Sequence, residues 1–375
     1  MDLAGLLGFF SLARKCLREV LWHREAERDF AFECRAALLC IDVGERPEAG
    51  GERRMNRIKT YLLLRQVKIH NANAFSSPLT IGFPAMTAWL GAMHALERKL
   101  RQHEALSGIR LKKLAVSCHD FDLQTYKGPG DYVNSVIITA NPLRKKGASF
   151  ERPPFIEEAR VHLNVSLLIE IDGLMPGDFP IFEEKVTEAL GRMKIAGGDV
   201  LGFSPIQDAI NLTSTRHSRI LLVDEKNEED NRRAIRSLMP GYVLIERRQL
   251  LQQRQEELNH QDTLQAMLDL LALHYEYDDE HDTWNVQPRK EKGWLVPIVT
   301  GFKGLTPLGH VSNQRDASTL HRFAEPVLTL GEFKMAHRFD CVDDMMWQYH
   351  YDEDKGLYVC VNEQMESDEE AKGED

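Results

Sequence analysis

The sequence lacks the short motifs that mark common catalytic and nucleotide-binding sites. The segment IAGGDVLG at 195–202 is neither a G-x-G-x-x-G fingerprint nor a phosphate-binding loop of the Walker type, because no Gly-Lys-Ser or Gly-Lys-Thr follows it. No nucleophile elbow and no His-Glu-x-x-His segment occurs in the 375 residues. The motifs therefore give no positive case for an enzyme.

Cysteine and long apolar runs are also scarce. The six cysteines lie at 16, 34, 40, 118, 341 and 360 and form neither a Cys-x-x-Cys pair nor a Cys/His spacing suited to zinc. We therefore expect reduced thiols, no bound metal and no cofactor. The apolar run near the start is too short to span a bilayer and lacks a basic segment before it. These features predict a cytoplasmic protein without a membrane segment.

The formal net charge of −11 is concentrated at the end of the chain. Residues 363–375 hold seven acids and one lysine, so the remaining 362 residues carry only −5. We expect 363–375 to be a solvated, disordered acidic tail. A mildly acidic body is not typical of a protein that binds nucleic acid through its overall charge, although one basic strip could still hold a single strand.

Residues 1–54 form a separate N-terminal piece. They combine helix-favouring charged stretches with half of the cysteines and end in the linker-like run GERPEAGGERR, directly before Met55. Two interpretations stay open for this piece. It is either a helical extension or the product of a translation start assigned too far upstream.

The next part, 55–225, alternates strand-like and helix-like segments. Strands are predicted at 60–69, 109–121 and 160–171 from their apolar and β-branched residues. A helix is predicted to begin at Pro84 and run to about Leu100, and a second one covers 179–193. A glycine loop then leads into a further strand. This order predicts an α+β fold with a ferredoxin-like core, which is the arrangement of the RNA-recognition motif.

An insertion of about 122–159 interrupts this core between its second and third strands. Asn141-Pro142 and Gly147 bracket three cations, Arg144, Lys145 and Lys146, as the tip of a projecting hairpin would. By charge alone this tip is either a solvated turn or a binding element. Residues 226–362 form a mixed helical and β region, in which 231–273 looks largely helical and 294–308 resembles a pair of strands.

The stretch HNANAFSSPLTIGFP at 70–84 contains no charged residue, in a chain of which 28% is charged. It joins the first strand to the first helix and holds two asparagines and three hydroxyl groups. One interpretation is an N-cap and turn cluster that steers the chain into the helix. The other is a binding junction whose polar groups serve a ligand.

Several segments together resemble a known family. HNANAFSSPLTIGFPAMTAWLGAMHAL, NPLRKKG, EEARVHLNVSLLIEI, MKIAGGDVL, LMPGYVLI, KGWLVPIVTGFKGLTPL and DKGLY resemble, in this order, the subunit of the type I-F CRISPR surveillance complex that caps the 5′ end of the guide RNA. The resemblance runs from about Arg57 to about Tyr358. It implies a core like the RNA-recognition motif with a protruding thumb, and tight pairing with the large subunit of the complex. It also implies contact with the adjacent backbone subunit and a non-catalytic role.

The resemblance also implies that the chain holds the 5′ repeat-derived handle of the crRNA in a bent shape. In this hypothesis the two asparagine amides read base edges, an aromatic ring stacks on a base, and hydroxyls near a helix start bind phosphate. These residues are Asn71, Asn73, Phe75, Ser76, Ser77 and Thr80. The thumb cations contact phosphates, glycines let the backbone approach the strand, and two sheet residues contribute at the edge. These residues are Arg144, Lys145, Lys146, Gly197, Gly198, Arg160 and His162.

Two other functions stay open on sequence grounds. A metal-independent endoribonuclease of the same fold could use His94 or His119 as the base, together with a lysine that stabilises the leaving group. A scaffold that touches only protein is the third reading.

Overall fold

The computed structural model describes residues 58–136, 142–152, 158–203, 219–224, 226–258, 262–278, 281–287 and 293–362. The N-terminal piece 1–54 and the tail 363–375 lie outside these residues. The described part is a mixed α/β structure built on a large, mainly antiparallel sheet. None of its helices is long and apolar enough to cross a membrane.

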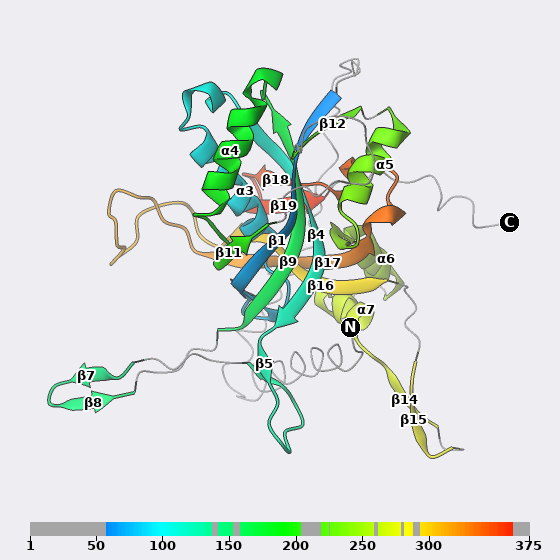
Figure 1. Cartoon of the computed structure of the whole chain (residues 1–375). Coiled ribbons are helices and arrows are strands. Elements are labelled where there is room, and N and C mark those ends of the chain that lie inside the picture. The colour runs from blue at the N-terminus through cyan, green and yellow to red at the C-terminus, as the bar shows by residue number, and fades with distance from the viewer. Residues whose placement is uncertain are drawn as a thin grey trace.

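The first half supplies four long or central strands and two helices, as the sequence predicted. The strands are β1 (Ile58–Asn73), β4 (Arg110–Leu123), β9 (Arg160–Asp172) and β11 (Gly198–Gly202). The helices are α3 (Met86–Leu100) and α4 (Phe179–Leu190), and the short β10 (Lys194–Ile195) pairs with β11. In the sheet these strands follow the order β11-β1-β9-β4, and all neighbours are antiparallel. Figure 1 shows α3 and α4 lying on one side of these strands.

The packing of α3 follows from the spacing of its apolar residues. Side chains that recur every three or four positions form one buried stripe, which faces the sheet. The apolar members of this stripe are Met86, Trp89, Leu90, Met93, Leu96 and Leu100. Trp89 Nε1 also donates to the carbonyl of Pro84 at 3.2 Å, which fixes the first turn of the helix to the chain before it. The helix and the sheet share one hydrophobic cluster with α4.

A second hydrophobic cluster covers part of the sheet face opposite α3 and α4, around the start of β1. There β12 (Ile220–Asp224) pairs with the start of β1, and α5 (Glu228–Ser237) packs over them with the turns η3 (Ala336–Arg338) and η4 (Asp343–Met345). Asn227 caps α5 by accepting a hydrogen bond from the N–H of Glu229 at 3.0 Å. The rest of this face, around the end of β1 and the start of β9, keeps polar side chains such as His70 and His162.

The last third of the chain extends the same sheet and closes it on itself. The strands are β13 (Tyr242–Glu246), β16 (Trp294–Gly304), β17 (Ala324–Met335), β18 (Trp347–Asp352) and β19 (Leu357–Asn362). The order continues β4-β13-β17-β16-β19-β18, and Trp347 of β18 pairs back with Leu114 of β4. These six strands therefore form a ring that starts and ends at β4. The helices α6 (Arg248–Glu257) and α7 (Thr263–Leu271) pack on its β16 and β17 side.

Two predictions for this region need correction. The segment 231–273 is largely helical and interrupted at 239–241, as expected, but the interruption continues into β13, a strand hydrogen-bonded to both β4 and β17. The segment 294–308 is one strand rather than a pair, and its hydrogen-bonded partners are β17 and β19, which come later in the chain. Both errors have one cause. A short buried apolar run has no distinctive period, and its strand partners are distant in sequence.

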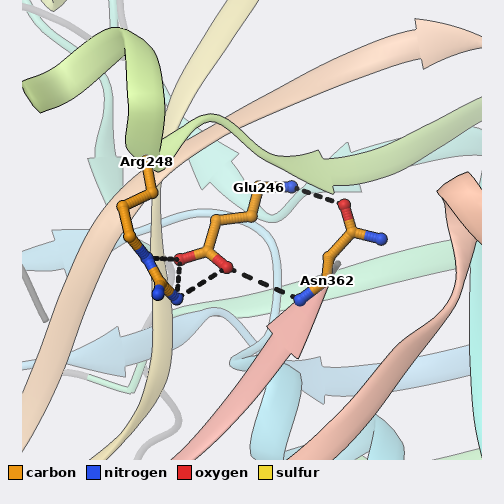
Figure 2. A network of polar contacts seen from close by, with 3 residues as sticks. All are labelled: Glu246, Arg248 and Asn362. Carbon is orange, nitrogen blue, oxygen red and sulfur yellow. Dashed lines mark hydrogen bonds and ion pairs between the residues drawn. The ribbon is translucent and has the colours of Figure 1, made fainter. Parts of the chain in front are cut away.

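Figure 2 shows a buried ion pair, Glu246–Arg248, next to the hydrogen bonds by which Asn362 joins the end of β19 to β13. Glu246 is almost fully buried, and its carboxylate accepts three hydrogen bonds of 2.8–3.0 Å from the guanidinium of Arg248. The side chain of Asn362 accepts from the N–H of Glu246 at 3.2 Å and donates to the carbonyl of Met346 at 2.9 Å. Burial raises the pKa of Glu246, and the charge of Arg248 opposes that shift.

Four short hairpins complete the described part. They are β2 (Phe75–Ser77) with β3 (Thr80–Ile81), β5 (Thr125–Tyr126) with β6 (Ser135–Val136), β7 (Arg144–Lys146) with β8 (Ser149–Glu151), and β14 (Tyr275–Asp278) with β15 (Thr283–Val286). Single turns η1 (Glu104–Leu106) and η2 (Pro176–Asp178) precede β4 and α4. Figure 1 shows the β7–β8 and β14–β15 hairpins lying away from the sheet.

Candidate RNA interface

The strand β1 bulges twice, and each time a side chain of β9 accepts a hydrogen bond from the displaced backbone. The pairing of β1 with β9 shifts between Leu64 and Val67 and again between Ile69 and Ala72. In the second bulge Asn71 has φ +56°, and its N–H donates to Nδ1 of His162 at 3.1 Å. A non-glycine residue at positive φ persists only where its surroundings hold it there, and such residues gather at functional sites.

The first bulge is held in the same way, by a β9 side chain four residues after His162. Gln66 has φ +50°, and its N–H donates to Oγ of Ser166 at 3.1 Å. Bulges next to a binding site redirect side chains of the strand. The two bulges therefore shape the polar end of this sheet face.

The second bulge brings two imidazoles together. The rings of His70 and His162 stack with their centroids 4.1 Å apart and their planes 17° from parallel. Arg160 lies two residues before His162 on β9, where it forms an ion pair with Glu158. Both histidines are half-buried, so the stack presents part of its surface to solvent. We call His70, Asn71, Arg160, His162 and Gly197 the bulge surface.

The turn between β10 and β11 lies against the same bulge. Ala196 and Gly197 both have positive φ, +50° and +77°, as a two-residue type I′ hairpin requires. The carbonyl of Ala196 accepts from the N–H of Asn73 at 2.8 Å. A Cβ atom on Gly198 would lie 2.7 Å from the N of Ala72 and from the O of His70. Gly198 is thus required by the protein's own backbone, whereas the space around Gly197 is open.

The uncharged stretch 70–84 contains the end of β1 and then a tight hairpin, β2–β3, rather than a helix cap. The amide of Asn73 brackets Phe75, accepting from its N–H and donating to its carbonyl, both at 3.0 Å. The hydroxyls of Ser76 and Ser77 both bond to that of Thr80, at 2.9 and 2.8 Å. Ser77 is buried. The predicted turn cluster is confirmed.

The N-cap part of that interpretation was wrong, because α3 is preceded by Ala85 and has no side-chain cap. The three hydroxyls bond to one another inside the hairpin. Their predicted contact with phosphate near a helix start stays a prediction. Phe75 is half-buried and packs on the core, so only part of its ring is free to contact a ligand.

The charge on the open sheet face changes across the strands. Lys68 on β1 pairs with Asn164 on β9, which pairs with Asp120 on β4. Lys68 and Asp120 are exposed, and Oδ1 of Asn164 is a buried atom without a hydrogen-bond partner. Asp122 on β4 lies opposite His162. The positive charge of this row therefore lies on β1 and the negative charge on β4.

The three cations of the predicted thumb lie on β7, and all three are exposed. Lys146 forms an exposed ion pair with Glu151 at 3.1 Å, and Lys145 lies opposite Phe150, which is 67% exposed. Within the described residues, no contact joins this hairpin to the bulge surface. The chain thus places the predicted residues in two groups, one on the sheet and one on the hairpin.

The two histidines of the endoribonuclease reading occupy different surroundings. Nδ1 of His119 donates to the carbonyl of Pro240 at 2.7 Å, so Nε2 accepts from the hydroxyl of Ser166 at 2.6 Å. Burial lowers the pKa of His119, with a smaller lowering from the charge of Arg65, while the Pro240 carbonyl raises it. His94 is exposed on α3. His119 lies on β4, and its partner Ser166 lies on the sheet face that α3 does not cover. Both nitrogens of His119 are therefore engaged within the protein.

Sequence reasoning missed the parts that depend on backbone geometry. The residues are Gln66, Ser166, His70 and Ala196, which build the bulges and the type I′ turn. Positive φ at Gln66 and Ala196 leaves no sequence signal, because neither residue type favours it. Signals existed for Asn71, because asparagine tolerates positive φ, and for Gly197, through the Gly-Gly pair. The described residues hold no group of three or more His, Cys, Asp or Glu side chains placed to bind a metal ion.

Comparison with known proteins shows the family of the chain. The chain matches the family described as "CRISPR-associated protein (Cas_Csy2)" over residues 62–360. It is 36% identical over 320 residues to the CRISPR-associated protein Csy2 of Pseudomonas aeruginosa (strain UCBPP-PA14), an alignment that covers 79% of this chain and 93% of that protein. The match takes in both bulges, the β10–β11 turn and the closed ring of strands. The chain therefore belongs to the Csy2 family of CRISPR-associated proteins.

Proposed function

We propose that this protein is a non-catalytic, RNA-binding subunit of a type I-F CRISPR complex that holds the 5′ repeat-derived handle of the crRNA. The observation that carries the proposal is the convergence at the bulge surface. There the end of β1, the start of β9 and the β10–β11 turn meet through the Asn71–His162 hydrogen bond and the Asn73–Ala196 hydrogen bond. Membership of a CRISPR-associated family supplies the biological context.

The topology of the first half supports a core like the RNA-recognition motif. The strand order β11-β1-β9-β4 is the ferredoxin-like order, in which the first and third strands lie at the centre. Domains of this kind bind single-stranded RNA on the open sheet face. Here the helices cover the opposite face, and the open end of β1 and β9 carries a stacked pair of imidazoles. Stacking on such rings is how unpaired bases are held.

The two groups of site residues divide the work by chemistry. On the sheet, the His70–His162 stack offers ring faces, and Gly197 leaves open space for a backbone to approach. On the hairpin, Arg144, Lys145 and Lys146 offer charge for phosphates and Phe150 offers an exposed ring. A single strand that spans both would be bent, since the hairpin lies away from the sheet (Figure 1).

The protein is further proposed to pair with the large subunit of the complex and to contact the adjacent backbone subunit, in the cytoplasm. The exposed apolar residues of the 302–323 segment support a role within an assembly. Phe302, Leu305 and Phe323 are each 44–55% exposed. Exposed apolar side chains grouped in this way mark protein interfaces.

The endoribonuclease reading is the second candidate, and the geometry at His119 weighs against it. A general base needs a free nitrogen within reach of the substrate hydroxyl, and here both nitrogens are bonded to Pro240 and Ser166. Incubation of the purified protein with repeat RNA and a chelator separates the readings. Intact RNA agrees with the proposal, and cutting that His119→Ala or His94→Ala abolishes would replace it.

The direct test is ultraviolet crosslinking of the full chain, within its assembled complex, to a crRNA. We expect the crosslinked peptides to include residues 70–75 and 160–162, and the crosslinked nucleotides to lie in the 5′ handle. Crosslinks confined to the other subunits would favour the reading in which this chain touches only protein. Crosslinks to the central guide segment alone would place the chain elsewhere on the RNA.

A further inference from the structure

The β14–β15 hairpin has one face made entirely of apolar side chains. Tyr275 pairs with Val286, and Tyr277 pairs with Trp284, so all four side chains lie on the same side of the two strands. The rings of Tyr277 and Trp284 are 5.2 Å apart. The opposite face carries Glu276, Asp278, Thr283 and Asn285.

This apolar face is exposed to solvent along its whole length. Trp284 is 68% exposed, Val286 52%, Tyr275 47% and Tyr277 40%. None of the four side chains belongs to a hydrophobic cluster of the described residues, and Figure 1 shows the hairpin pointing away from the body of the protein. A two-stranded ribbon cannot bury its own face, and large exposed aromatic groups mark interaction sites.

The charge of the hairpin decides between the two kinds of macromolecule that aromatic side chains commonly bind. Residues 274–287 include five acids and no lysine or arginine. Phosphate groups are repelled by such a surface, so single-stranded nucleic acid is disfavoured. The β7–β8 hairpin has the opposite character, with Arg144, Lys145 and Lys146 in a row. The two hairpins therefore suit different partners.

We propose that the aromatic face of β14–β15 docks into an apolar groove of another protein subunit, and that lysine and arginine side chains border this groove. Tyr and Trp are the residues that most often dominate protein interfaces, where a ring of charged contacts surrounds the buried centre. Asp282, whose carboxylate accepts from the Tyr277 hydroxyl, would supply such a charged contact beside the aromatic face. The inference rests on the proposed function only in taking the partner to be a protein of the same complex.

Site-specific photocrosslinking in the assembled complex tests the proposal. A benzophenone amino acid replaces Trp284 in one variant and Asn285, on the polar face, in the matched control. We expect residue 284 to crosslink to a protein segment that contains lysine or arginine, with at least about fivefold higher yield than residue 285. Crosslinks to the guide RNA, equal yields from both positions, no crosslink at all, or a partner segment without basic residues would each overturn it.

Two further variants test the same interface without a crosslinker, by their incorporation into the complex. Tyr277→Ser with Trp284→Ser should weaken incorporation into the complex by about tenfold or more, since hot-spot residues are lost. Asp282→Asn should weaken it at low salt and converge with the wild type at high salt. Unchanged incorporation of the first variant would overturn the proposal. The guide RNA content of each particle is measured separately, so a failure of the proposed RNA-binding function is recognised independently.

Discussion

The N–H of Asn71 donates to Nδ1 of His162 across 91 residues of sequence, with a distance of 3.1 Å. Because Nδ1 accepts, the proton of the neutral ring lies on Nε2. The same hydrogen bond holds Asn71 at φ +56°, outside the region that its neighbours in β1 adopt. One side chain of β9 therefore fixes both the shape of the β1 bulge and the position of its own ring on His70.

Replacement of His162 tests this coupling. His162→Ala removes the acceptor and the ring stack, and we expect the free energy of unfolding to fall by about 1–2 kcal/mol. Handle RNA should bind more weakly as well. His162→Asn retains an acceptor at the position of Nδ1. It should therefore recover most of the stability lost in His162→Ala, but RNA should still bind weakly because the ring is absent. Urea unfolding and fluorescence anisotropy give the two readouts, and loss of both in the Asn variant would contradict a separate role for the ring.

The adjacent glycines of the β10–β11 turn should respond differently to alanine. Gly198→Ala places a methyl group 2.7 Å from two backbone atoms of β1, and we expect a loss of about 3 kcal/mol. Gly197→Ala has open space and only the strain of positive φ, which costs about 1 kcal/mol. Thermal unfolding of the two variants checks the ranking. Equal losses would mean that the turn relaxes and that Gly198 is not held against β1.

Removal of the hairpin cations should change how salt affects RNA binding. The triple variant of Arg144, Lys145 and Lys146 to Ala should lower handle affinity and reduce the salt slope by up to about 2, at about 0.7 for each phosphate neutralised. Competition from Glu151 for Lys146 makes the effect smaller than for three free cations. A matched control changes three exposed cations elsewhere, Arg192, Lys226 and Arg232, to Ala. An identical slope in both variants would separate the hairpin from the RNA.

Protonation of His119 should contribute to the pH dependence of the free energy of unfolding. Its pKa in the folded protein is lower than the ordinary 6.5, chiefly through burial, so the unfolded chain binds a proton more readily. The stability that neutral His119 contributes is fully present above 6.5 and is lost as the pH falls from 6.5 through the folded pKa. His119→Gln should flatten the pH dependence of the free energy of unfolding in this window. A curve parallel to the wild type would contradict the assignment.

The buried pair Glu246–Arg248 should be sensitive to the loss of one partner. Glu246→Ala leaves the Arg248 guanidinium without its carboxylate, and we expect a loss of about 3–5 kcal/mol. The double variant Glu246→Leu with Arg248→Met removes both charges and should recover part of that loss. Urea unfolding measures each. A double variant less stable than Glu246→Ala would show that the pair contributes more than the apolar replacement.

Local pattern was enough to predict the elements of the first half. The stripe from Met86 to Leu100 has the helical period, and the alternation in 160–171 has the period of a strand, so both appear where expected. The predicted contact residues His162, Asn71 and Gly197 also lie together in the structure. The predicted roles of Asn73 and Ser77 depended on free polar groups, which the hairpin itself uses.

The parts that sequence could not predict depend on distant partners. β13 is a strand because β4 and β17 flank it. Its partners on β4 lie about 125 residues earlier and those on β17 about 90 residues later, and its own five residues carry no period that reveals this. The bulges at Gln66 and Asn71 are set by side chains on β9. The domain boundary between residues 225 and 226, which divides the chain into 55–225 and 226–362, stays a prediction.

Strand β4 belongs to both halves of the protein, because it pairs with β9 on one edge and with β13 and β18 on the other. A truncation that ends before β13 would leave the N–H and C=O groups of that second edge unpaired in water. Such an edge is a template for pairing with other chains and leads to aggregation. Any fragment designed for isolated expression must therefore keep the chain through β19, and split or fused versions are best made at the exposed hairpins.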